Sequence, residues 1–172
     1  VNYNIKPACP AGRPLNLFIM YTGLLHIHSI LRYIILLLLL ITIFKSFIGW
    51  FGKKPFTGGM RKLNLFALIF SHIQLLVGLA VYFMNAKVKA AFADMGAAMK
   101  NPELRFWSVE HILMMVIAIA LITVGYSLSK KGKTDEVKHK RIAIFFLIAL
   151  IVIFAAIPWP WSAIARGWMP GV

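Results

Sequence analysis

The amino-acid sequence predicts an all-α fold, an integral membrane four-helix up-down bundle with both termini outside. Hydrophobic residues make up 60% of its 172 residues, mean hydropathy is +0.80, and only five residues are acidic. Four apolar segments are each long enough to cross a hydrocarbon core of about 30 Å, which takes roughly 20 helical residues. Helices are required because isolated strands leave backbone groups unpaired in lipid. We therefore expect a multi-pass protein of the cell inner (cytoplasmic) membrane.

The four spans are expected at about residues 21–48, 63–84, 106–128 and 142–157, within a bundle covering residues 20–165. Residues 1–19 are predicted to be a poorly ordered tail and not a signal peptide, because Pro7, Pro10 and Pro14 interrupt them. Residues 166–172 are predicted to form a C-terminal tail.

The basic residues predict the orientation in the bilayer. Net charge is +14, and two connections that fall on one side carry eleven basic residues: Lys45, Lys53, Lys54, Arg61, Lys62, Lys130, Lys131, Lys133, Lys138, Lys140 and Arg141. The positive-inside rule places these loops in the cytoplasm. An outer interfacial belt is then formed by Trp107, Trp159, Trp161 and Trp168, with Trp50 at the inner interface. Since the charges flank apolar runs and form no stripe with interleaved aromatics, the expected partner is the lipid bilayer and not nucleic acid.

Residues 86–100, between the second and third spans, show a weaker pattern. Val88, Phe92, Met95 and Met99 recur at helical spacing and predict a short helix lying flat on the outer surface. Gly96 and several alanines weaken this pattern, and an irregular loop is the alternative.

Ionisable residues inside the spans are the candidates for function, because they are costly in lipid. They are His26, His28, Arg32, His72, Glu110 and His111. Cys-based metal sites and internal disulfides are excluded, since Cys9 is the only cysteine. The sequence also contains no P-loop, Gly-x-Ser-x-Gly, His-Glu-x-x-His or carboxylate-rich metal motif.

His28 and His111 are predicted to lie at the same depth. At 1.5 Å per residue they lie about 10 and about 8 Å below the outer ends of spans one and three. In an up-down bundle these spans are plausible diagonal neighbours. Two level histidines on facing helices are what a bis-histidine haem b needs. His26 is the rival ligand, but it is about 200° away from His28 around the helix, so only one of the two can face the site, and we favour His28.

Arg32, Glu110 and His72 each have more than one possible role. Arg32 shares a face with His28 and can pair with a haem propionate or with Glu110. Glu110 can accept a hydrogen bond from a histidine, relay protons or reach water at the interface. His72, about 18 Å below the outer end of its span, can line a quinone pocket, pair with His111, or only join helices through a hydrogen bond. His139 is expected in the solvated basic loop.

The stretch Met20-Tyr-Thr-Gly-Leu-Leu-His-Ile-His-Ser-Ile-Leu-Arg32, together with Ser71-His72-Ile-Gln74 and Glu110-His111, resembles small four-helix membrane proteins of the cytochrome b type. It is loosely similar to cytochrome b561, to copper-resistance membrane bundles and to one half of haem A synthase. The Glu-x-x-His-Arg element of that synthase is absent at Glu110-His111-Ile112, which argues against synthase activity. The resemblance covers most of residues 20–165 and implies haem b binding through transmembrane histidines and electron transfer.

The first functional hypothesis is a b-type cytochrome-like subunit. It would hold one haem b between His28 (or His26) and His111 and pass electrons between a quinone pool and a respiratory complex partner. The sequence favours an electron-transfer or accessory subunit over a stand-alone enzyme. The alternatives are a non-catalytic accessory or assembly subunit, and a small proton or solute transporter using Glu110, His72 and Arg32. A copper or zinc site built from His26, His28 and His111 is a further option.

Overall fold

The structure is a computed structural model that describes residues 15–162 and residue 164. Over these residues it is all-helical, with four helices long and apolar enough to cross a membrane. The four are α1 (Leu15–Phe51), α2 (Gly58–Met84), the continuous helix Pro102–Lys130 and α7 (Asp135–Ala156). The third consists of α5 (Pro102–Arg105), the π-helical turn η1 (Phe106–Glu110) and α6 (His111–Lys130). Two short helices, α3 (Ala86–Ala93) and α4 (Met95–Lys100), join α2 to α5.

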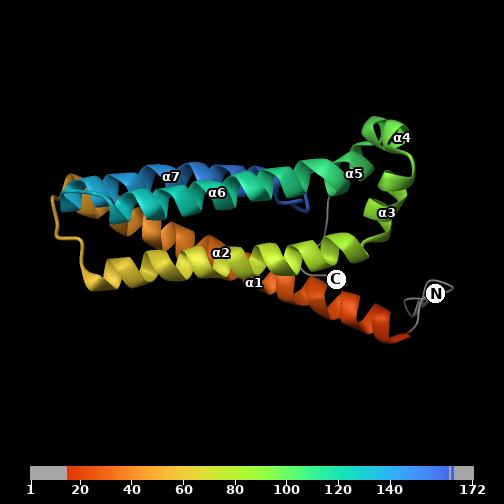
Figure 1. Ribbon diagram of the computed structural model, residues 1–172, viewed down its shortest axis with the longest axis horizontal. Coiled ribbons are helices and arrows are strands. Elements are labelled where there is room, and N and C mark those ends of the chain that lie inside the picture. The colour runs from red at the N-terminus through yellow and green to blue at the C-terminus, as the bar shows by residue number, and fades with distance from the viewer. Residues whose placement is uncertain (1–14, 163, 165–172) are drawn as a thin grey trace.

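The four long helices pack side by side into a bundle (Figure 1). α7 packs extensively on both α6 and α1, α1 packs on α2, and α2 contacts α6 less extensively. Around the bundle the order is therefore α1, α2, α6 and α7. This order puts α1 and α6 on a diagonal, as the sequence predicts for the first and third spans.

The helices contain most of each predicted span and extend beyond it. Residues 15–19, predicted as part of the tail, form the first turn of α1, and α7 ends at Ala156, one residue before the predicted end. Threonine N-caps explain two of the starts: the Thr57 side chain accepts from the Met60 N–H, and that of Thr134 accepts from the Val137 N–H. Residues 1–14 and 166–172, the rest of both predicted tails, lie outside the described residues.

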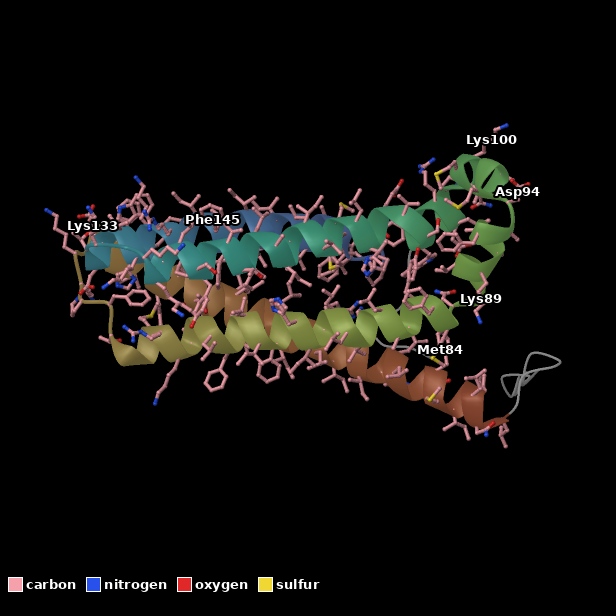
Figure 2. All side chains as sticks on the ribbon, in the orientation of Figure 1. Met84, Lys89, Asp94, Lys100, Lys133 and Phe145 are labelled. Atoms are coloured by element: carbon pink, nitrogen blue, oxygen red, sulfur yellow. The ribbon has the colours of Figure 1, made fainter. Side chains whose placement is uncertain are left out.

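The core is narrow and most of the long apolar side chains face outward. Leu39, Ile122, Ile142 and Phe146 are fully buried, whereas about thirty large hydrophobic side chains are exposed. Figure 2 shows these outward apolar side chains along the length of the bundle. An outer surface this apolar is suited to lipid, since water would make it aggregate.

The basic loops lie at one end of the molecule. The α1–α2 and α6–α7 connections are both at the left in Figure 1, and α3 and α4 are at the opposite end. Figure 2 shows Lys133 at the first end, and Lys89, Asp94 and Lys100 at the second. Trp50 lies in the last turn of α1, where the Nζ of Lys140 is 5.3 Å from its ring centroid.

The predicted flat helix over residues 86–100 is wrong in its continuity, because the segment is two helices broken at Asp94. The Asp94 backbone leaves the helical region (φ −147°, ψ 88°) and its side chain accepts a hydrogen bond from the Ala97 N–H, which starts α4. Val88 is buried, but Phe92 is 60% exposed. The break turns the predicted apolar face, so two alanines, Ala91 and Ala98, are buried instead.

The expectation of a solvated His139 is also wrong. Its side chain is 2% exposed and its ring meets the ring of Phe56 edge-on, with centroids 4.9 Å apart. The physical reason is the early start of α7 at Asp135, which puts position 139 one turn inside the helix. There its ring lies against Gly49 of α1, where a Cβ would overlap it.

Candidate functional site

The rings of His28 on α1 and His111 on α6 face each other across the bundle. Their centroids are 6.4 Å apart and their planes make an angle of 64°. Both residues are half-buried. The two rings therefore lie close together on diagonal helices, while their depth in the bilayer stays a prediction.

The His111 ring is held by a backbone carbonyl of another helix. Its Nδ1 lies 2.9 Å from the carbonyl oxygen of Ala156, at the end of α7. A carbonyl can only accept, so Nδ1 must carry the proton, and in the neutral ring Nε2 then keeps its lone pair. Metal-ligating histidines are oriented by the same kind of hydrogen bond.

The His28 ring packs against Gly78 of α2, where there is no side chain. A Cβ built on Gly78 would be 3.0 Å from its Cε1 atom, so any larger residue would push the ring. Gln74, one turn earlier on α2, donates from Nε2 to the His28 carbonyl at 2.9 Å. These two contacts set the position of α1 on α2 at the level of the histidine pair.

Two mainly apolar cavities adjoin the pair. The first has a volume of about 90 Å³ and also borders Gly78, Tyr82 and Trp107. The second, of about 50 Å³, also borders Arg32. The walls that both cavities share are His28, Gln74, His111, Met115 and Ile119.

The size of these cavities decides what can enter without rearrangement. A single water needs a cavity of about 10–15 Å³, so each of these cavities can hold a few waters or a small chemical group. A porphyrin is larger, and would require neighbouring side chains to change rotamer. Met115 lies between the cavities and is of the most adaptable residue type.

The π-helical turn η1 immediately precedes His111. Within it, the carbonyl of Ser108 accepts a hydrogen bond from the Tyr82 hydroxyl at 2.7 Å, and the Ser108 hydroxyl donates to the Leu104 carbonyl at 2.6 Å. Single π-turns inside α-helices occur frequently at functional sites. Neither Tyr82 nor Ser108 is among the residues that the sequence predicts for the site, because no pattern of residue types marks a π-turn.

Arg32 and Glu110 do not form the pair that the sequence suggested. Glu110 binds Arg105 instead, with 2.6 Å between its Oε1 and the arginine Nε, and both side chains are about 40% exposed. Arg32 donates from Nη2 to the hydroxyl of Tyr33 at 2.9 Å, and its guanidinium carbon is 4.6 Å from that ring's centroid. Of the two, only Arg32 borders a cavity of the histidine pair.

His72 and His26 lie away from the pair. His72 is exposed on α2, and its Nδ1 is hydrogen-bonded to the Leu68 carbonyl of its own helix at 2.9 Å. His26 is half-buried but borders neither cavity. Over the described part of the chain, no three His, Cys, Asp or Glu side chains come together to hold a metal ion, so His26, His28 and His111 form no copper or zinc site of this kind.

Glu110, His72 and Arg32 are likewise not assembled into a relay, because Glu110 is bound to Arg105 and His72 faces outward.

Comparisons with protein-family models, with curated proteins and with solved structures give no match. The function is therefore inferred from the geometry of the chain itself.

Proposed function

We propose that this chain is a membrane subunit of the b-type cytochrome kind, which binds haem b between His28 and His111 and takes part in electron transfer. The observation that carries the proposal is the 6.4 Å between the two ring centroids. Two imidazoles this close, one from each of two diagonal helices, would be able to hold the iron of a single haem, which would supply the redox chemistry.

The surroundings of the pair support the same function. Haem, when bound, supplies one-electron chemistry, and the protein sets its potential by ligation and burial. The hydrogen bond that His111 donates from Nδ1 to the Ala156 carbonyl orients the imidazole and makes Nε2 the nitrogen that carries the lone pair. The guanidinium of Arg32, at the edge of the second cavity, is suited to pair with a carboxylate of the cofactor.

The proposed placement in the membrane follows from charge. Both basic loops lie at one end of the molecule, and the positive-inside rule puts this end in the cytoplasm. The bundle is then up-down with both termini outside, and the histidine pair lies in the outer half of the inner membrane. From there it would exchange electrons with a membrane quinol and with a respiratory partner on the outer side.

The experiment is a reduced-minus-oxidised optical spectrum, with a pyridine haem assay, of protein purified from haem-supplied cells. We expect one haem b per chain, lost in His28→Ala and in His111→Ala. Matched controls are His26→Ala and His72→Ala, the same change in the same helix or its neighbour, and Glu110→Gln; all three should keep the haem. Loss of haem in the controls but not in the pair would refute the proposed ligands.

A second function is favoured by the small volume of the two cavities. If the histidines only join helices, the chain is a non-catalytic accessory or assembly subunit, and their contact with each other and with Ala156 is structural. In that case the wild-type protein carries no haem, and His28→Ala and His111→Ala lower thermal stability and partner co-purification. Haem stoichiometry therefore separates the two functions.

A further inference from the structure

A third cavity, lined mainly by polar and basic residues, lies at the opposite end of the bundle from the histidine pair, beside the basic loops. Its volume is about 160 Å³, more than either cavity at the histidines. Three helices and one loop enclose it, and it borders Phe56, Arg61, Asn64, Tyr126, Ser129, Lys130 and Lys138. Among these described residues three are basic and none is acidic, so the cavity favours an anion.

The positive charge of this cavity is only partly neutralised. Lys138 pairs with Asp135 at 2.8 Å, but over the described residues no carboxylate lies within ion-pair distance of Arg61 or Lys130. The Lys130 amine is 5.7 Å from the Tyr126 ring centroid and that of Lys138 is 6.0 Å from the Phe56 centroid. Both distances are near the outer limit of a cation–π contact, which positions an amine without cancelling its charge.

The side chain of Asn64 is a second, independent indication of a ligand in this cavity. Its side chain is 1% exposed, and its Oδ1 has no hydrogen-bond partner among the described residues. A buried amide oxygen without a donor is costly, so its presence in the cavity wall points to a bound group that donates a hydrogen bond. Since Asn64 is deeper in α2 than Arg61, the donor must lie deeper in the cavity than the anion.

We propose that this cavity binds a phosphate ester that carries a neighbouring hydroxyl group. Arg61, Lys130 and Lys138 would bind the phosphate oxygens, and Asn64 Oδ1 would accept from the hydroxyl. Two sources share this chemistry: the glycerophosphate headgroup of an anionic lipid, and a soluble glycerol phosphate. The position of the cavity at the helix ends suits a headgroup, since basic pockets between membrane helices bind anionic lipid headgroups.

The test measures the thermal midpoint of the purified full chain in detergent while a ligand is titrated. The probes are phosphatidylglycerol, phosphatidylmethanol, glycerol 3-phosphate and inorganic phosphate. A ligand that binds the folded state raises the midpoint in proportion to its occupancy. We expect phosphatidylglycerol to bind best, and phosphatidylmethanol, which lacks the headgroup hydroxyls, to bind more weakly.

Two double variants with equal loss of charge separate the cavity from the general surface. Arg61→Gln with Lys130→Gln removes cavity charges, and Lys62→Gln with Lys131→Gln removes the adjacent charges that do not border the cavity. All four side chains are exposed enough for both proteins to fold. We expect the first pair to raise the dissociation constant at least about tenfold, as lost charge-assisted hydrogen bonds do, and the second to leave it within about threefold.

The outcomes are distinct. A shift with phosphatidylglycerol that only the cavity pair abolishes assigns the site to a lipid, and the same result with glycerol 3-phosphate alone assigns it to a soluble ester. Equal losses in both double variants, or no shift with any probe, would overturn the proposal. A response to inorganic phosphate equal to that of the esters would overturn the role given to Asn64.

Discussion

At the scale of single residues, depth along a helix could be predicted from the sequence but the direction of each side chain could not. Counting residues from the helix ends placed His28 and His111 level, and their rings are 6.4 Å apart. The same count placed His72 near the membrane centre, yet its ring faces outward. Direction depends on which helices are neighbours, and it is the packing of α2 between α1 and α6 that turns His72 away.

Gly78 gives the first prediction. A methyl group on this residue would lie 3.0 Å from His28 Cε1, so Gly78→Ala should displace the imidazole and lower haem content by at least about twofold. Gly23→Ala is the matched control in a spanning helix, since a Cβ there meets nothing within 4 Å. The measurement is the haem content per chain. Equal haem content in both variants would contradict the close packing of the His28 ring against Gly78.

At the scale of elements, hydropathy predicted the long helices well and the short ones poorly. Each long helix is predicted by some twenty apolar residues, so no single residue decides its existence. The boundary between α3 and α4 instead depends on one side chain, because Asp94 caps α4 and ends α3. The π-turn η1 was not predicted either. The turn is marked by the backbone hydrogen bond from the His111 N–H to the Phe106 carbonyl, and no spacing of residue types reveals such a bond.

The tight contact between α6 and α7 gives the second prediction. A Cβ on Gly125 would overlap the Cβ of Phe145, an atom fixed to the α7 backbone that cannot rotate away. Gly125→Ala should therefore force the helices apart and cost about 1–3 kcal/mol, although alanine favours helix.

Unfolding in detergent, followed by circular dichroism, measures this cost. Gly58→Ala in the first turn of α2 is the control, since a Cβ there has nothing within 4 Å, and it should be neutral or stabilising. An unchanged midpoint for Gly125→Ala would show that α6 and α7 are not packed this closely.

At the scale of the whole molecule, the all-helical fold with four membrane-length helices agrees with the sequence prediction. Composition fixes this result, because 60% hydrophobic residues leave lipid as the suitable solvent. Orientation is a property of the chain and the membrane together, so it remains a prediction from the basic loops.

Cysteine labelling tests this orientation. With Cys9 replaced by serine, Lys133→Cys should react with an impermeant thiol reagent only after the membrane is opened, and Lys89→Cys should react in spheroplasts with an intact membrane. These two lysines lie at opposite ends of the molecule (Figure 2). The reverse pattern would place the basic loops outside, and labelling of both in intact spheroplasts would contradict the alternating topology.

The measurement that tests the central claim most directly is the electron paramagnetic resonance spectrum of the oxidised protein, which reports both axial ligands of the iron. We predict a low-spin signal of bis-imidazole ligation in the wild-type protein. It should change to a high-spin signal, or vanish with the haem, in His28→Ala and in His111→Ala. A high-spin wild-type spectrum, or a bis-imidazole signal that survives either substitution, would contradict the shared ligation of one haem by His28 and His111.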